Sequence, residues 1–409
     1  VRSSAASDVY KRQVIQQRIR AENLKKIYQL VNQNRSISRA ALSKETNLSK
    51  PTVSSLVDEL IVNKYLIDCG TVVSQQMGRR PSELRVNGTE NLVAVISWRR
   101  ARLDIALITA DNKIAFRDQI PLTEEEDKVD KITSTFFNIM KPKVGDRRIM
   151  GLCIIIPGII DAENKRILST VIGVGYSDPV VQRFEEAFHD YPFCLLNDTA
   201  CFAYAEYVFA NITEPNFAYI NVSKGVGACL FANGKMLRGA GSNATQFGHF
   251  SIDRNGPLCA CGNHGCVERV VGENALTERA EACGIDLTRF AGRKPLYCDI
   301  GAMAEDGDAH AKELIKDLAV DLSFAISNLI TLFNPSLVVI GGMGVNLGPF
   351  FLSNIRDEVQ NSGFKEFVSN TWIQYSTLGL DSELGGAARY YIDHYYDFFE
   401  QMQGGLYAD

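Results

Sequence analysis

Three cysteines and two histidines lie close together in the second half of the chain. Cys259, Cys261 and Cys266 fall within eight residues, with His249 before them and His264 among them. Zn²⁺ prefers four tetrahedral sulfur or nitrogen ligands in structural sites, which three thiolates and one histidine supply. His264 would have to fold back within a very short ring, so His249 is the favoured fourth ligand. The alternative is a loop of reduced thiols without a metal.

The composition excludes several classes of protein. The chain has 409 residues, of which 46% are hydrophobic and 22% charged, so it is not expected to be disordered. No apolar run approaches the roughly 20 residues that span a membrane. Ten cysteines without an N-terminal signal segment argue for thiols or a metal rather than a disulfide framework. We therefore expect a cytoplasmic protein of two or three domains.

Charge is distributed unevenly along the chain. Residues 1–87 carry 15 Lys and Arg against seven Asp and Glu, whereas residues 88–409 carry 28 against 41. A basic segment joined to an acidic remainder points to a polyanion as the partner of the basic segment. The other interpretation is a charged surface without a partner. Residues 1–13 show no hydrophobic periodicity, and we expect them to be a disordered leader or an artefact.

Residues 14–87 are predicted to form a winged helix-turn-helix domain. From residue 20, apolar side chains recur at helical spacing in three successive segments. Ser38 and Ser49 are good N-caps for the second and third segments, and Pro51 fits a first turn. Two short helices with a tight turn near Asn47 match a helix-turn-helix. The third helix would bury Val53, Leu56, Val57 and Leu60.

The other face of the third helix and a hairpin after it are the predicted DNA contacts. In such motifs the N-terminal part of the second helix meets base edges in the major groove. Two β-like stretches, residues 66–73 and 82–86, flank a tip with two arginines, which is typical of a wing aimed at phosphates or the minor groove. The alternative is a small helical dimerisation module with a charged tip. The predicted DNA contacts are Ser49, Lys50, Thr52, Ser54, Ser55, Arg79 and Arg80.

Residues 88–409 show the pattern of layered α/β domains. Strand-like stretches alternate with helical ones, and residues 311–333 form a long amphipathic segment that could pack on a sheet or a partner subunit. The strand-like stretches are residues 92–96, 103–109, 150–156, 193–196, 218–222, 228–231 and 337–340.

Several short motifs occur along the chain from about residue 20 onward. They are the cysteine loop with Gln246-Phe247-Gly248-His249, Ile156-Pro157-Gly158, Asn197-Asp198, residues 223–227, residues 340–344, Ser49-Lys50-Pro51-Thr52 and Gly78-Arg79-Arg80-Pro81. In these motifs the chain resembles the ROK family of repressors, open reading frames and kinases, and its N-terminal domain is similar to that of the repressor branch. The resemblance implies an actin/hexokinase-like fold of two α/β lobes, about residues 88–197 and 198–409, with a sugar cleft between them. It also implies a homodimer or tetramer.

We do not expect the chain to be an enzyme. Phosphoryl transfer needs nucleotide phosphates held by backbone amides and a metal, together with a base for the sugar hydroxyl. ROK kinases open their first lobe with an Asp-x-Gly-x-Thr phosphate loop, and the matching stretch here is Ile96-Ser97-Trp98-Arg99-Arg100-Ala101. Asp, Gly and Thr are all missing, and Trp98 and Arg99 would obstruct such a loop. Lys224 also stands where the kinases usually carry Thr.

A sugar site is the second implication of the resemblance. Planar amides and carboxylates bind adjacent sugar hydroxyls in pairs. Asn197 and Asp198 would hold the hydroxyls, although a turn or helix cap is the alternative role for this pair. His249 would touch both zinc and sugar. The predicted effector contacts are Asn197, Asp198, Gln246, His249 and Glu268.

The expected function is a sugar-responsive, DNA-binding repressor of carbohydrate-utilisation genes that contains structural zinc. It would bind a palindromic operator and release it when a sugar or sugar phosphate occupies the cleft. Gln246 replaces a Glu that is usual in the family, and Gly173 replaces an Asn. These changes keep open a DNA-binding regulator whose ROK domain no longer senses sugar. A ROK sugar kinase and a regulator controlled by a partner protein also stay open.

Overall fold

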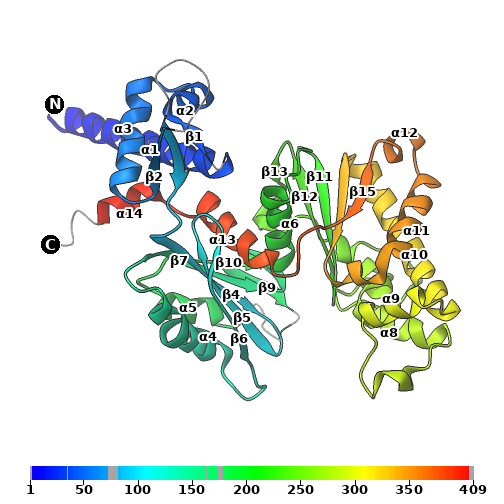
Figure 1. The fold of residues 1–409 in the computed structure, drawn as a ribbon. Coiled ribbons are helices and arrows are strands. Elements are labelled where there is room, and N and C mark those ends of the chain that lie inside the picture. The colour runs from blue at the N-terminus through cyan, green and yellow to red at the C-terminus, as the bar shows by residue number, and fades with distance from the viewer. Residues whose placement is uncertain are drawn as a thin grey trace. The chain divides into compact units, whose positions relative to one another are not determined.

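A computed structural model describes residues 2–34, 36–71, 82–161, 164–170, 172 and 178–404. The chain divides by its internal contacts into two compact units (Figure 1). Unit 1 comprises Val1–Ile156, Ser177–Leu195 and Ala387–Asp409, and unit 2 comprises Pro157–Tyr176 and Leu196–Gly386. Among the described residues, no helix is long and apolar enough to cross a membrane.

This division differs from the predicted lobes at residues 88–197 and 198–409. The N-terminal domain belongs to the same compact unit as the first lobe, residues 157–176 belong to unit 2, and the C-terminus returns to unit 1. The helix α13 (Ser382–His394) therefore begins in unit 2 and ends in unit 1. Such crossings follow from tertiary packing, which a linear pattern does not encode.

The N-terminal domain is a winged helix-turn-helix, as predicted. The strands β2 (Leu66–Thr71) and β3 (Ser82–Val86) pair antiparallel, and β1 (Ile37–Ser38) pairs with β3. The Ser38 hydroxyl accepts a hydrogen bond from the N–H of Ala41 at the start of α2 (Arg39–Thr46). Asn47 ends α2 in the left-handed conformation, and α3 (Lys50–Val62) buries the four apolar residues predicted for it.

The first helix, α1 (Arg2–Gln33), differs from the prediction for residues 1–13. Helical backbone begins at Arg2, where we expected no regular structure. This stretch contains two alanines, two arginines, one lysine and one glutamine, and all four residue types favour the helical state. A helix already nucleated by the packed residues Leu24, Ile27 and Val31 can extend backwards through such residues without an apolar face of its own.

Unit 1 also contains a five-stranded mixed sheet in the order β10-β7-β4-β5-β6. Strand β4 is buried at every position, which is typical of a strand covered on both faces. Helices α4 (Lys128–Thr135) and α5 (Val180–Ala187) belong to the same unit, with two short helical segments at Phe136–Met140 and Lys141–Lys143. The strands are β4 (Asn91–Trp98), β5 (Arg102–Thr109), β6 (Ile114–Pro121), β7 (Arg148–Ile156) and β10 (Phe193–Asn197).

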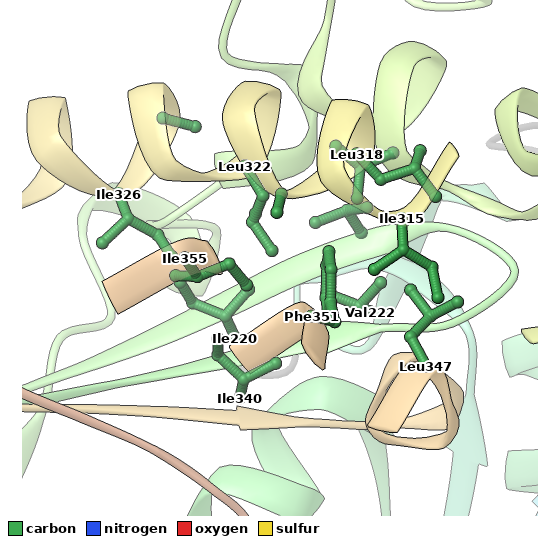
Figure 2. Packing of buried hydrophobic residues seen from close by; sticks show 14 of the residues in the cluster. Ile220, Val222, Ile315, Leu318, Leu322, Ile326, Ile340, Leu347, Phe351 and Ile355 are labelled. Carbon is green, nitrogen blue, oxygen red and sulfur yellow. The ribbon is translucent and has the colours of Figure 1, made fainter. Parts of the chain in front are cut away.

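Unit 2 contains a second five-stranded sheet in the order β13-β12-β11-β14-β15 and the hairpin β8-β9. Figure 2 shows the long helix α10 (Ala309–Phe333) above this sheet, with Leu318, Leu322 and Ile326 directed at Ile220 and Ile340. This packing confirms the amphipathic segment predicted at residues 311–333. The strands are β8 (Gly158–Asp161), β9 (Arg166–Thr170), β11 (Phe217–Val222), β12 (Val226–Ala232), β13 (Lys235–Met236), β14 (Leu337–Gly341) and β15 (Trp372–Tyr375).

The remaining helices of unit 2 contact either this sheet or α10. α6 follows β10 directly, and α7 follows the cysteine loop. The helices are α6 (Asp198–Phe209), α7 (Val267–Val271), α8 (Glu273–Ala282), α9 (Tyr297–Glu305), α11 (Gly348–Gln360) and α12 (Lys365–Val368), with 3-10 turns at Ala240–Ser242, Phe247–His249, Leu287–Phe290 and Met343–Leu347.

The C-terminal segment packs against the winged helix within unit 1. The rings of Tyr28 on α1 and Phe398 on α14 (Phe398–Gly404) lie 4.5 Å apart, and Figure 1 shows the two helices side by side. The hydroxyls of Tyr65 and Tyr396 are 2.5 Å apart, and the Arg148 guanidinium lies 4.6 Å from the centre of the Tyr65 ring. All four rings are buried. The segment with Tyr396 and Phe398 is thus a structural part of the N-terminal domain.

Replacing Phe398 with alanine is expected to destabilise this junction. The side chain is 1% exposed, so its loss leaves a cavity and lowers the free energy of unfolding of unit 1 by about 3 kcal/mol. Urea denaturation followed by intrinsic tyrosine fluorescence measures the loss. Phe350→Ala is the matched control, because Phe350 is 39% exposed and its truncation removes less buried surface. Equal losses in the two variants would contradict the role of the junction.

Candidate functional sites

The structure places the predicted recognition helix as expected. The Ser49 hydroxyl accepts a hydrogen bond from the N–H of Thr52 at 3.3 Å and so caps α3. Lys50, Thr52 and Ser55 are exposed, and Ser54 is half-buried. The first turn of α3 therefore presents one cation and small hydroxyl groups, which suits close approach to base edges and phosphates.

Arg39 fixes the angle between the two helices of the motif. It donates to the backbone oxygen of Ser54 at 3.2 Å and pairs with Asp58 at 2.7 Å. Sequence reasoning missed this arginine, since nothing in its spacing distinguishes it from a surface charge. The predicted wing contacts Arg79 and Arg80 lie outside the described residues.

Four predicted metal ligands come together in unit 2. The Nδ1 or Nε2 of His249 and the sulfurs of Cys259, Cys261 and Cys266 all lie within 4.8 Å of one another. Cys259 Sγ is 3.6 Å from His249 Nδ1, and Cys261 Sγ is 3.6 Å from Cys266 Sγ. Tetrahedral ligands around zinc, with Zn–S near 2.3 Å, are about 3.8 Å apart. The arrangement is thus consistent with a zinc site of the ROK type.

His264 lies outside this cluster, in agreement with the choice of His249 as the fourth ligand. Its Nδ1 lies 3.0 Å from the backbone oxygen of Gly256. The loop turns at Gly265, which has a φ of +58°, and any Cβ there would overlap the backbone of Asp253. Such a turn requires glycine, and it directs the sulfur of the next residue, Cys266, inward to the cluster.

The environment of the thiols differs from one to the next. The backbone N–H of Asn263 lowers the pKa of the exposed Cys261 thiol, whereas burial raises the pKa of Cys266. A bound divalent cation would favour the thiolate form of both, because metal binding displaces thiol protons.

Three segments that carry predicted effector residues meet at the start of β12. Glycines there permit close approach: a Cβ at Gly227 would lie 2.6 Å from the hydroxyl of Thr199 in the first turn of α6, and one at Gly225 would overlap Glu268. The Glu268 carboxylate accepts a hydrogen bond from the N–H of Val226 at 3.3 Å. The sequence analysis named residues 223–227 as a motif, but it did not predict that three segments meet there.

The segment with Gln246 and His249 reaches the same turn. Gly248 packs on the backbone oxygen of Val226 so closely that a Cβ would overlap it. Tyr297 contacts the turn from another side. Its hydroxyl lies 3.0 Å from the backbone oxygen of Ser223 and 3.0 Å from that of Val271. Burial raises the pKa of this phenol, so it remains a neutral donor.

Asn197 caps a helix in the structure, which was the alternative to its predicted role as a sugar contact. Its Oδ1 accepts a hydrogen bond from the N–H of Ala200 and caps α6, while its Nδ2 donates to the backbone oxygen of Gly158 at 2.6 Å. Asp198 follows as the first helical residue and is half-buried. Of the pair, Asp198 is therefore the stronger candidate for an effector contact.

A tight hairpin occupies the place of the kinase phosphate loop. β4 ends at Trp98, which is 2% exposed, and the N–H of Arg99 bonds to the backbone oxygen of Arg102 at 2.9 Å. Asp104 pairs with both Arg99 and Arg102. This hydrogen-bonded turn carries two arginines in the stretch where the kinase loop has Gly and Thr.

Two family models match the chain. The model described as winged helix-turn-helix DNA-binding matches residues 20–65, and that of the ROK family matches residues 97–393. Both agree with the predicted order of domains.

Curated relatives match at similar identity over nearly their whole length. The xylose repressor of Bacillus spizizenii is 27% identical over 387 residues, which cover 93% of this chain and 97% of the relative. The N-acetylglucosamine repressor of Escherichia coli O6:H1 is 26% identical over 375 residues, which cover 88% and 90%.

Solved structures show the same fold. A crystal structure described as a ROK family transcriptional regulator, homologous to the MLC protein of E. coli, matches with a TM-score of 0.79 and 24% identity over 94% of this chain and 98% of that one. A ROK family glucokinase from Streptomyces griseus, in complex with glucose and AMPPNP, matches with a TM-score of 0.61 and 22% identity over 73% and 98%.

These matches confirm the predicted fold class, mixed α/β with an N-terminal winged helix-turn-helix and an actin/hexokinase-like domain of two sheets. The ROK model alone covers more than half of the chain. The chain belongs to the ROK family.

Proposed function

We propose that this protein is a transcriptional repressor that binds a palindromic operator and releases it when a sugar or sugar phosphate binds in unit 2. The observation that carries the proposal is a capped, exposed recognition helix in the same chain as a ROK domain whose first loop lacks the Asp, Gly and Thr of the kinases. The similarity to xylose and N-acetylglucosamine repressors supports a carbohydrate as effector and carbohydrate-utilisation genes as targets.

A homodimer would place two winged helices in successive major grooves, with half-sites separated by turns of about 10 bp. A sugar acts on DNA binding only through different affinities for the binding and non-binding states. Helix α13 supplies a covalent route for this coupling. It begins in unit 2 and leads into Tyr396 and Phe398, which contact the winged helix.

The effector contacts proposed for unit 2 are Asp198, Gln246, His249 and Glu268, with Asn197 as the cap that orients Asp198. A zinc ion held by His249, Cys259, Cys261 and Cys266 would supply a structural cross-link. Cys266 is also the N-cap residue of α7, and Glu268 lies in the first turn of that helix. The cross-link would therefore position Glu268 against the turn at the start of β12.

The proposal predicts no ATP-dependent phosphorylation of sugars. Residues 99–102 contain neither the glycine that lets a backbone approach phosphate closely nor a carboxylate for Mg²⁺. A coupled assay for ADP release, with hexoses, pentoses and amino sugars, is expected to show no turnover above background. A ROK glucokinase measured in parallel is the control. Sugar-dependent ADP release would favour the kinase alternative.

Selection of duplexes from a random-sequence pool tests DNA recognition. Zinc-loaded protein is expected to enrich a palindrome and to bind it with a Kd of about 10⁻⁸ M or lower at physiological salt. Competitor DNA without the palindrome gives the non-specific affinity, which we expect to be at least about a thousandfold weaker than the affinity for the palindrome. Equal affinity for both duplexes would refute the proposed function.

A further inference from the structure

The four residues of the metal cluster are not equally accessible. Cys259 and Cys266 are buried, with 3% and 0% of their surface exposed, and His249 is half-buried. Cys261 is exposed, and so are its neighbours within residues 260–264. One sulfur of the cluster is therefore open to small molecules in the solvent, whereas the other two are not.

A zinc ligand at this position would be reactive as well as accessible. A thiol that coordinates a metal ion is deprotonated by it. The thiolate is the nucleophilic form of cysteine, and its oxidation depends on its accessibility. With zinc bound, Cys261 would be an accessible thiolate, so it is the place at which an oxidant attacks the cluster first.

The sulfur of Cys266 is placed to complete the oxidation. It lies 3.6 Å from the sulfur of Cys261. A disulfide bond is about 2.05 Å long, so the two atoms need to approach each other by about 1.5 Å. The four residues between the two cysteines include Gly262 and Gly265. Glycine gives a short loop the conformational freedom that such an approach needs.

Other thiols of the chain lack this combination of exposure and a partner sulfur. Cys153 and Cys194 lie 3.8 Å apart, but they are 0% and 2% exposed in unit 1. Neither sulfur is accessible to an oxidant in the folded chain. Cys298 is exposed but lies outside the metal cluster. Exposure and a neighbouring sulfur coincide at Cys261.

We propose that Cys261 is an oxidation site, at which hydrogen peroxide joins Cys261 to Cys266 in a disulfide and thereby displaces zinc. The Cys261 thiolate attacks one peroxide oxygen, the O–O bond breaks, and the leaving hydroxide takes up a proton to give water. The sulfur of Cys266 then attacks the resulting sulfenic acid. The S–S bond forms, the S–O bond breaks, and the oxygen leaves with a second proton as water. Two thiolates thus lose two electrons, which reduce the peroxide to two water molecules.

The disulfide removes two of the four ligands, and His249 and Cys259 alone do not close a tetrahedral zinc site. Cys266 is also the N-cap residue of α7, and its sulfur lies 3.4 Å from the backbone oxygen of His249. Its displacement would detach the His249 segment from the helix that carries Glu268. The proposal rests on the proposed function, which includes the zinc ion and these effector contacts. Oxidation is therefore expected to abolish sugar-dependent operator release.

Zinc release from the full, zinc-loaded chain tests the proposal. Hydrogen peroxide is added in excess, and a chromogenic chelator measures the ion that leaves the protein. We expect about one zinc ion per chain to be released. Peptide mapping should then show a Cys261–Cys266 disulfide, with two hydrogen atoms fewer than the reduced peptides. A dithiol reductant added together with Zn²⁺ should reverse both changes.

The same ligand exchange at two positions gives a matched pair of variants. Histidine binds zinc but cannot form a disulfide. Cys261→His is expected to release zinc at least about tenfold more slowly than Cys259→His, because Cys261→His leaves only buried sulfurs in the cluster. Cys298→Ser is the control for other exposed thiols and should release zinc at the unmodified rate.

Retention of zinc by the unmodified chain in peroxide would overturn the proposal. Equal release rates in the two histidine variants, or a disulfide that does not contain Cys261, would overturn it as well. If neither histidine variant binds zinc, the peptide map of the unmodified chain decides. A chain that binds no zinc before oxidation refutes the zinc site of the proposed function, whereas a zinc-loaded chain that peroxide leaves intact refutes only the oxidation site.

Discussion

Serine in place of Cys259 is expected to reduce bound zinc from one ion per chain to less than about 0.1. Serine is a poor zinc ligand at neutral pH, and the three remaining groups do not close a tetrahedral site. Cys259 is 3% exposed. Loss of the ion should lower the free energy of unfolding of unit 2 by on the order of 4 kcal/mol, since loss of a structural metal belongs to the most costly class of substitutions.

Elemental analysis and thermal denaturation measure these two effects. Cys298→Ser is the matched control, because Cys298 is an exposed thiol of the same unit outside the cluster. The zinc-free variant should also lose sugar-dependent release, because α7 and Glu268 follow directly from Cys266. Full zinc content and unchanged operator release in the Cys259 variant would show that the cluster does not hold the ion.

The double variant Lys50→Ala, Thr52→Ala is expected to weaken operator binding about 100-fold or more. Both side chains are exposed in the first turn of α3. This turn of a recognition helix is the part that contacts base edges and phosphates. One lost base contact costs about 1–3 kcal/mol, and the lost cation lowers the salt dependence by about one phosphate contact.

Fluorescence anisotropy at several salt concentrations resolves these two contributions. Val62→Ala is the control on the same helix, because Val62 is 79% exposed at the C-terminal end of α3. Ser49 is a poor choice for this test, since its hydroxyl caps the helix. An unchanged affinity in the double variant, with helical content intact, would contradict the assignment of α3 as the recognition helix.

Local signals predicted the N-terminal domain well. Ser38 and Ser49 are N-caps in the structure as they were in the prediction, and Asn47 ends α2. Capping depends on residues within one turn of the chain, so a sequence carries it directly. The seven predicted strands are present as β4, β5, β7, β10, β11, β12 and β14.

Features without a strong local pattern were missed. Strand β6 is mostly exposed at the edge of its sheet, so its sequence lacks the apolar run of β4. The junction of Tyr28, Tyr65 and Phe398 joins residues more than 300 positions apart. Nothing near an aromatic residue in the sequence indicates such a partner.

The metal cluster was predictable from a local pattern, whereas the arrangement of the effector residues was not. The cysteine loop was predictable because its ligands and glycines lie within a short stretch, and only His249 had to be chosen over His264. The role of Asn197 as a cap, and the meeting of α6, Glu268 and the His249 segment at the start of β12, depend on which glycines face which neighbours. That information is three-dimensional.

The affinity of the zinc-loaded protein for its selected operator, with and without each candidate sugar at fixed salt, tests the account most directly. The sugars to be compared are pentoses, hexoses, amino sugars and their phosphates. The account predicts that one of them weakens operator binding at least tenfold, and that Asp198→Ala removes the response while leaving operator affinity unchanged. Operator binding that no sugar alters, in protein shown to be folded and zinc-replete, would contradict it.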